Sequence, residues 1–162
     1  MPWDSVSVPA NPAVQQTRAT TEEIEAYINA QGITSKTNYL VWTDLYRQRT
    51  YVFEKKDGWW TLYKDLLCST GKNTTPTPRG TFELTAYVPY FGVSKGYMCK
   101  NAVQFSGDYL FHSVMFDSTG SYLLEGTGVL GTRASSGCIR FSPDESEWFY
   151  KNMPLGTKVW IN

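Results

Sequence analysis

The part of the sequence that most limits the fold runs from Tyr39 to the C-terminus, where short apolar runs alternate with turn signals. The runs are rich in β-branched and aromatic residues, which favour strands, and glycine, proline and Asx residues separate them. Asp57-Gly58 lies between two such runs and predicts a tight hairpin. A second turn is predicted at 106–108. Long helical segments do not alternate with the strands, so a doubly wound parallel sheet is not expected. The sequence predicts a mainly β domain.

Two short helices are expected beside the strands. Thr20 and Glu23 have the spacing of a capping box, which predicts a helix over about 20–31 that ends at a glycine. Ser142-Pro143 has the cap serine and first-turn proline that begin a second helix. We expect residues 1–38 to form an N-terminal tail and short helix, followed by one β-rich domain over 39–162.

Length and charge limit the class of protein. A chain of 162 residues can form one domain with a sizeable core. Fifteen basic residues balance fifteen acidic ones, so there is no broad basic field and nucleic acid is not an expected partner. No apolar run reaches the length of a membrane span, so membrane insertion is not expected. The N-terminus lacks the pattern of a signal peptide, so the protein is either cytoplasmic or cut from a secreted or anchored precursor.

Three cysteines give no metal-site spacing. Cys68, Cys99 and Cys138 form no CxxC pair, and the chain has one histidine, so no metal is expected. A disulfide between Cys68 and Cys99 would leave Cys138 as the odd thiol. Sequence cannot show whether two cysteines lie within bridging distance, so this pairing stays open.

The stretch "ASSGCIRF" makes Cys138 the strongest candidate nucleophile. Gly137 allows the backbone to approach a ligand closely, and the amides around Ser136 and Gly137 can form an oxyanion hole. Arg140 lies on the same side as Cys138 if the segment is extended, where its charge would favour a thiolate or hold a carboxylate. The plainer interpretation is a small buried hydrophobe after a glycine turn.

His112 is the only histidine and the best partner for that thiol. It lies in the predicted strand "LFHSVMF", where alternation places Leu110, His112 and Val114 on one face. A lone histidine in a strand is most often a core or edge residue with a satisfied hydrogen bond. A functional role needs a partner, and a nearby imidazole can lower the pKa of a cysteine thiol.

The order of these motifs resembles that of the YkuD-type L,D-transpeptidases. In that family a histidine is followed, after a variable stretch, by Ser/Thr-His-Gly-Cys, an apolar residue and Arg or Asn; here the order is "HS…ASSGCIRF". "CSTGKNTTPTPRGTFEL" resembles the family's Thr-Pro-Thr-Pro-x-Gly-Thr-Phe segment, and "PLGTKVWIN" resembles its ending. The resemblance covers about Tyr39–Asn162. It implies a catalytic domain over 39–162 with a β-sandwich or barrel fold and one or two short helices.

The resemblance also implies an activity: a peptidoglycan L,D-transpeptidase that cross-links stem peptides through a cysteine acyl-enzyme and releases terminal D-Ala. The implied site residues are the nucleophile Cys138, the base His112, the orienting carbonyl of Ser113, the backbone of Ser136 and Gly137, and Arg140 for substrate. No cofactor is implied. Peptidoglycan stem peptides are the expected partners, carbapenems are expected to acylate the same cysteine, and a monomer is expected. The expected location is the cell envelope, with a signal or anchor missing from the sequence given.

Ser136 departs from the family pattern, which has histidine before Gly137. The departure affects local rigidity, substrate fit or rate more than the chemistry, because the family's base is the upstream histidine. Two alternatives remain: an L,D-carboxypeptidase with water as acceptor, and a catalytically weak module that binds the cell wall. Papain-like and NlpC/P60-type enzymes place cysteine before histidine, the reverse of the order here.

Two further segments have open roles. "PTPRGTF" is expected to be structural, since its prolines preorganise a turn and Gly80 lets the chain enter a strand. The aromatic insertion "YVPYFGVSKGY" is equally compatible with a lid over a cleft and with a satellite core.

Overall fold

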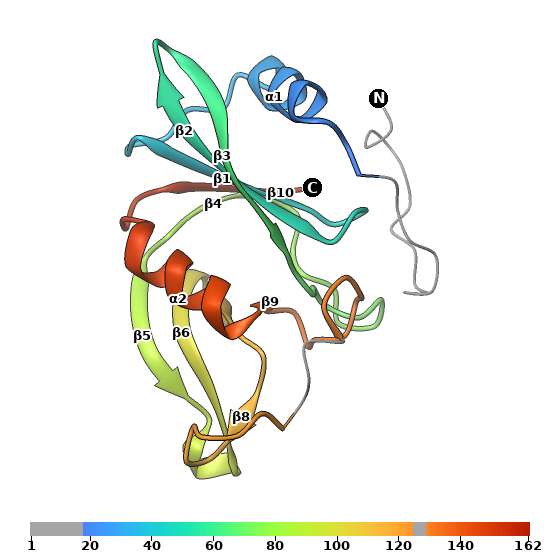
Figure 1. Ribbon diagram of the computed structural model, residues 1–162, viewed down its shortest axis with the longest axis vertical. Coiled ribbons are helices and arrows are strands. Elements are labelled where there is room, and N and C mark those ends of the chain that lie inside the picture. The colour runs from blue at the N-terminus through green and yellow to red at the C-terminus, as the bar shows by residue number, and fades with distance from the viewer. Residues whose placement is uncertain (1–17, 125–128) are drawn as a thin grey trace.

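The computed structural model describes residues 18–124 and 129–162 (Figure 1). Its helices are α1 Thr21–Ala30 and α2 Pro143–Asn152, and a 3-10 turn lies at Val93–Lys95. Its strands are β1 Tyr39–Asp44, β2 Arg49–Lys56, β3 Trp59–Leu67, β4 Gly80–Glu83, β5 Ala86–Phe91, β6 Tyr97–Ser106, β7 Tyr109–Ser113, β8 Phe116–Asp117, β9 Ile139–Phe141 and β10 Lys158–Ile161. Neither α1 nor α2 has the length and apolar character to cross a bilayer.

The strands form two mixed sheets, so the mainly β prediction is confirmed. The first sheet has the order β3-β2-β1-β10-β4, and its only parallel pair is β1 with β10. The second sheet has the order β5-β6-β7-β9, with β8 paired to β6, and here β7 and β9 are parallel. The last strand of the chain therefore lies inside the first sheet, between β1 and β4.

The main core lies between the two sheets and under α2. Its buried side chains come from inner faces of both sheets and from one side of the helix, including Val41, Val159, Phe111, Phe141 and Phe149. Phe149 packs on Phe111 with ring centroids 4.7 Å apart. Helix α2 lies against the second sheet in Figure 1. This packing fixes β7 and β9, the two strands that carry the candidate site.

A second core covers the outer face of the first sheet. Ile24, Tyr27 and Ile28 of α1 pack on side chains of β1, β2 and β3 such as Trp42 and Phe53. The first sheet is thus covered on both faces, which explains why β1 is buried at nearly every position instead of at alternate ones. Both hydrogen bonds of the predicted capping box of α1 are present: the Thr20 side chain accepts from the Glu23 amide, and the Glu23 side chain accepts from the Thr20 amide.

Local predictions hold where the structure describes the residues. Asp57 and Gly58 both have positive φ, 51° and 77°, as a two-residue hairpin turn requires. Residues 107–108 form the predicted turn between β6 and β7. Cys68 and Cys99 are both buried and form no disulfide, so that possibility is excluded in this structure. The N-terminal tail prediction for residues 1–17 and part of the predicted glycine-rich loop, residues 125–128, lie outside the described residues.

Candidate active site

The parallel pairing of β7 with β9 brings the predicted site residues together. Phe111 pairs with Ile139 and His112 pairs with Arg140. Because side chains alternate along a strand, the register that buries Phe111 and Ile139 in the core places His112 and Arg140 on the opposite face. Cys138 precedes Ile139 and lies on the same face as Arg140. The predicted constellation of Cys, His and Arg is therefore assembled.

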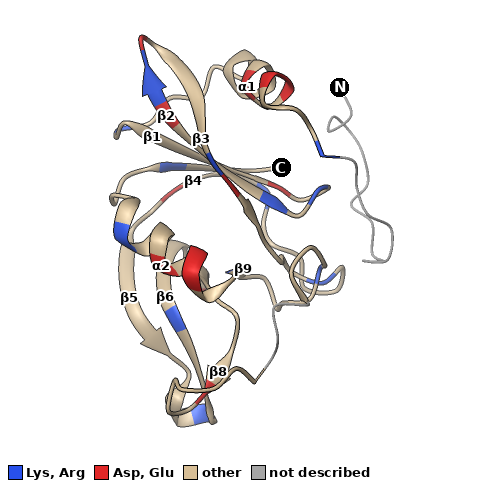
Figure 2. Ribbon diagram, in the orientation of Figure 1, with Lys and Arg blue, Asp and Glu red and all other residues tan. Residues whose placement is uncertain are grey.

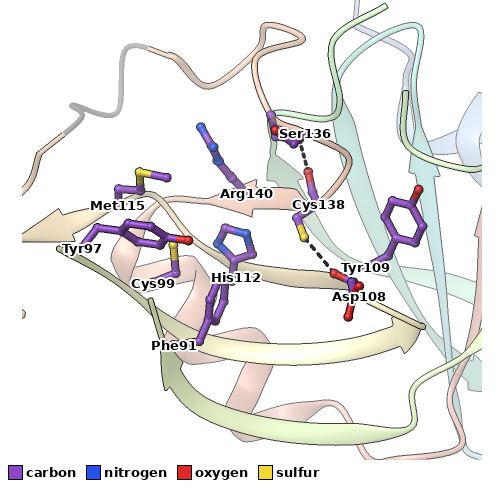
Figure 3. Close-up of a pocket in the computed structure, with 11 residues that line it drawn as sticks. Phe91, Tyr97, Cys99, Asp108, Tyr109, His112, Met115, Ser136, Cys138 and Arg140 are labelled. Carbon is purple, nitrogen blue, oxygen red and sulfur yellow. Dashed lines mark hydrogen bonds between the residues drawn. The ribbon is translucent and has the colours of Figure 1, made fainter. Parts of the chain in front are cut away.

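These side chains face one pocket of about 330 Å³ (Figure 3). Its wall is formed by the turn between β6 and β7, the aromatic insertion, β7 and the loop before β9. The residues that line it are Phe91, Tyr97, Cys99, Asp108, Tyr109, His112, Met115, Ser135, Ser136, Cys138 and Arg140. Within the described residues no group of three His, Cys, Asp or Glu side chains could hold a metal ion.

His112 is held as a neutral imidazole in one tautomer. Its Nδ1 lies 2.6 Å from the carbonyl oxygen of Ser113, and since a carbonyl only accepts, Nδ1 carries the proton and Nε2 keeps a free lone pair. The residue is 3% exposed, and its ring meets that of Phe91 edge-on with the ring centroids 5.1 Å apart. Burial lowers the pKa of His112 to about 4, so the imidazole is neutral at pH 7.

The Cys138 thiol is half-buried and protonated at rest. Its Sγ donates to the carbonyl oxygen of Asp108 at 3.5 Å (Figure 3). Burial raises the pKa of Cys138, while the backbone of Leu110 and the charge of Arg140 oppose that rise. The structure thus places a neutral thiol beside a neutral imidazole. In the resting site desolvation has the largest effect on the thiol pKa, and the neutral imidazole adds no charge that would lower it.

A tight turn presents Cys138 to the pocket. Ser135 Oγ accepts from the Gly137 amide at 3.0 Å and donates to the Cys138 carbonyl at 2.6 Å. Gly137 has φ 132°, and a Cβ there would lie 2.5 Å from the ring of Tyr109, so only glycine fits. The Gly137 amide is therefore already engaged. The amides of Ser136 and Cys138 donate to no acceptor in the described part of the chain.

The segment between β3 and β4 supports that turn, a role that sequence analysis assigned only in general terms. Thr77 is buried; its Oγ1 donates to the Gly137 carbonyl at 2.7 Å and accepts from the Gly71 amide at 2.9 Å. Thr75 Oγ1 donates to the Ser135 carbonyl at 3.0 Å. The structural interpretation of "PTPRGTF" agrees with these contacts. Threonine is common in loops, so no sequence signal singled out Thr77.

A second support reaches the turn from the first sheet. Gln48, in the β1–β2 turn, has its Nε2 2.8 Å from Thr70 Oγ1 and its Oε1 2.9 Å from the Thr70 amide. The Thr70 carbonyl in turn accepts from the amides of Ala134 and Ser135, at 2.9 and 3.1 Å. Sequence analysis missed this chain of contacts, because it joins residues more than sixty positions apart.

The remaining predicted residues have distinct positions. Ser113 is buried, its Oγ accepting from the Lys100 amide at 2.9 Å, so both its carbonyl and its hydroxyl are used. The Ser136 side chain is exposed and makes no hydrogen bond to a described residue. The residues of the aromatic insertion have two different environments. Phe91 and Tyr97 line the pocket, whereas Tyr87 donates to the Met153 carbonyl at 2.6 Å and packs on α2.

Known proteins share the sequence pattern and the fold of this chain. Residues 38–161 match the YkuD L,D-transpeptidase catalytic domain. The chain is 34% identical over 131 residues to YciB of Bacillus subtilis (strain 168), whose name carries a provisional L,D-transpeptidase assignment. The match covers 75% of this chain and 66% of YciB, so the chain spans just under two thirds of that relative.

Two solved structures share the fold. A fused Zn-dependent amidase/peptidase/peptidoglycan-binding domain-containing protein from Clostridium acetobutylicum is 29% identical with a TM-score of 0.68, over 98% of this chain and 68% of that one. The L,D-transpeptidase LdtMt1, solved in complex with imipenem, has a TM-score of 0.62 at 19% identity, over 77% of this chain and 59% of that one. This chain belongs to the YkuD family of L,D-transpeptidase catalytic domains.

Proposed function

We propose that the protein is a peptidoglycan L,D-transpeptidase that uses Cys138 as its nucleophile. The observation that carries the proposal is the neutral pair in one pocket: a protonated thiol on the β9 side and, on β7, an imidazole whose Nε2 is free to accept a proton. The donor would be a stem tetrapeptide whose third residue is a diamino acid.

In the first step the Cys138 S–H turns from the Asp108 carbonyl toward His112 and gives its proton to Nε2. The sulfur bonds to the carbonyl carbon after the third residue of the stem, and the carbonyl oxygen becomes an oxyanion. The free amides of Cys138 and Ser136 are the available donors for that oxyanion. The C–N bond then breaks, His112 returns the proton to the leaving amine, and D-Ala departs from a thioester.

In the second step the side-chain amine of another stem attacks the thioester carbonyl. His112 takes the proton from that amine, the C–S bond breaks, and the sulfur recovers a proton as the new amide forms. The carbonyl of Ser113 holds the imidazole in the one tautomer that serves both steps, and stabilises the imidazolium that forms in each. Arg140, on the pocket face beside His112, would hold an acidic group of the donor.

A carbapenem tests the nucleophile. LdtMt1, which shares this fold, was solved in complex with imipenem, and by the proposal a carbapenem acylates Cys138 here. Mass spectrometry after incubation should show one covalent adduct on the wild-type protein and none on Cys138→Ala. An adduct that survives Cys138→Ala would refute the assignment of the nucleophile.

Product analysis tests the reaction. A defined tetrapeptide with an added amine acceptor should give free D-Ala and a cross-linked peptide. If only tripeptide and D-Ala appear at saturating acceptor, water is the acceptor and the enzyme is a carboxypeptidase. If the peptide binds to the wild-type protein without turnover and Cys138 resists alkylation, the domain is a wall-binding module. The proposal places the substrate, and hence the working protein, in the cell envelope.

A further inference from the structure

Two loops that support the nucleophile turn carry cations and no carboxylate. Residues 66–82 include Lys72 and Arg79, and residues 129–143 include Arg133 and Arg140, but neither segment has an aspartate or a glutamate. Figure 2 shows no acidic residue on the described loops before β4 and β9. Since the whole chain has as many acidic as basic residues, the excess of positive charge is local.

The two loops are joined directly, and the join fixes the backbone on both sides of Arg133. Ser69 Oγ donates to the Thr132 carbonyl at 2.6 Å, and the Ala134 amide donates to the Thr70 carbonyl at 2.9 Å. Arg133 therefore projects from a rigid stretch of backbone, although it lies in a loop without regular secondary structure. A fixed backbone reduces the entropy cost of using such a side chain to bind a ligand.

The guanidinium of Arg133 is only partly satisfied. Its Nη1 donates to Asn73 Oδ1, while its Nε is buried and has no hydrogen-bond partner among the described residues. The other terminal nitrogen, Nη2, is not buried and has no partner among the described residues, so it is the donor that a ligand oxygen can reach. No described acidic side chain forms an ion pair with Arg133 or Arg79.

Arg79 adds a second positive charge to the same place. Arg79 is exposed, and its charge is near enough to act on Arg133. The pKa of Arg133 is lowered mainly by burial and further by repulsion from Arg79. Two like charges held together without a counterion attract an anion. The accessible Nη2 of Arg133 and the exposed guanidinium of Arg79 can each donate a charge-assisted hydrogen bond to a carboxylate oxygen.

The position of Arg133 indicates whether it would bind the donor or the acceptor peptide. Arg133 does not line the pocket of Cys138 and His112, into which the donor carbonyl must enter. It contacts Asn73 instead, next to Lys72, whose amide donates to the Ser135 carbonyl of the nucleophile turn at 2.9 Å. A carboxylate bound there would belong to a molecule that approaches the thioester from outside the donor pocket.

We propose that Arg133, with Asn73 and Arg79, forms a carboxylate-binding subsite for the acceptor peptide. This inference rests on the proposed transpeptidation. The subsite orients an amine-bearing peptide by its free carboxylate, and so favours the amine over water in attack on the thioester.

The test separates the two half-reactions. The probes are an acceptor tripeptide with free carboxylates and the same tripeptide with those groups converted to carboxamides. The wild-type protein should show a KM for the amide acceptor about tenfold above that for the acid, as loss of a charge-assisted hydrogen bond implies. Arg133→Gln should raise the KM for the acid to the value for the amide, while carbapenem acylation, which needs no acceptor, stays within about twofold of wild type. Lys56→Gln, at the tip of the β2–β3 hairpin, is the matched control and should change neither quantity.

Several outcomes overturn the inference. Equal KM values for the two acceptors with wild-type protein would show that no carboxylate is recognised. An unchanged acid-to-amide ratio in Arg133→Gln would remove Arg133 from the subsite. Slower carbapenem acylation by Arg133→Gln, with the ratio unchanged, would mean that the residue supports the turn instead. The wild-type comparison needs no variant, so it holds even if Arg133→Gln does not fold.

Direct binding keeps this test independent of turnover. Calorimetric titration of the Cys138→Ala protein should give tighter binding of the acid tripeptide than of the amide, and Arg79→Gln should reduce the difference. Failure of the proposed function appears differently, as a wild-type protein that forms no thioester with any donor.

Discussion

Thr77 Oγ1 donates a hydrogen bond of 2.7 Å to the carbonyl oxygen of Gly137, the residue before the candidate nucleophile. A trans peptide bond is planar, so the amide of Cys138 points away from the carbonyl that Thr77 holds. That amide has no acceptor among the described residues and is one of two free donors beside the thiol. Thr77 thus sets the direction of the amide that we propose as an oxyanion donor, without itself lining the pocket.

Thr77→Val should slow thioester formation more than it reduces stability. The valine keeps the shape but leaves the Gly71 amide and the Gly137 carbonyl without a partner, at a cost of about 1–3 kcal/mol in unfolding free energy. We expect the rate of carbapenem acylation to fall roughly tenfold or more, because the Cys138 amide is no longer fixed. Stopped-flow acylation and urea denaturation measure the two effects. Thr77→Ser keeps the hydroxyl and should restore the rate; a Thr77→Val protein with the wild-type rate would contradict the positioning role.

Gly137→Ala should abolish acylation and destabilise the fold. Alanine is strained at a φ of 132°, and its Cβ would lie 2.5 Å from the Tyr109 ring. We expect a loss of about 2 kcal/mol or more in unfolding free energy. Gly58→Ala is the matched control, since its φ is also positive, 77°, but nothing lies within 4 Å of its Cβ. Equal losses in the two variants, each measured by urea denaturation, would show that the contact with Tyr109 is unimportant.

Stability should fall as the pH drops from about 6.5 to 4, and His112 should be responsible for part of that fall. The pKa of His112 is about 4 in the folded protein, below the value near 6.5 expected for the unfolded chain. Between these values the unfolded chain binds a proton that the folded protein does not, so acidification favours unfolding. The effect reaches about 3 kcal/mol by pH 4.

Chemical denaturation of wild type and His112→Gln across this pH range isolates the contribution. The difference between their unfolding free energies should shift by that amount between pH 7 and pH 4, while Ser136→Ala should follow the wild-type curve. A difference that is constant with pH would mean that His112 titrates normally in the folded protein.

Ser136→Ala should change the acylation rate by less than about twofold. The Ser136 side chain is exposed and bonded to no described residue, so its removal leaves the turn made by Ser135 and Thr77 intact. Ser136→His restores the family's usual residue and tests whether the serine lowers the acylation rate. A large gain in rate in Ser136→His would show that the serine limits activity; a large loss in Ser136→Ala would show that its hydroxyl takes part.

The local predictions succeeded where short-range chemistry decides the conformation. The capping box at Thr20, the Asp57-Gly58 turn and the cap at Ser142 each depend on residues within a few positions of one another. The types and order of Cys138 and His112, which resemble those of a known family, also singled them out as candidate nucleophile and base, and the structure places both on one pocket; their catalytic roles stay predictions. The limits of β7 were less accurate: the predicted strand extended to Phe116, but β7 ends at Ser113, whose Oγ donates to the next carbonyl, that of Val114, at 2.8 Å.

The sequence by itself determined a mainly β chain, its turns and caps, and the residue types that could perform acyl transfer, since these follow from backbone preferences and functional-group chemistry. Only the tertiary structure decided that β10 lies between β1 and β4, that β7 pairs with β9 in the register that joins His112 to Arg140, and that Thr77 holds Gly137. It also decided the protonation states, because burial is what lowers the pKa of His112 and raises that of Cys138. Pairing, long-range hydrogen bonds and desolvation depend on distances between segments far apart in the chain, and no local pattern encodes those distances.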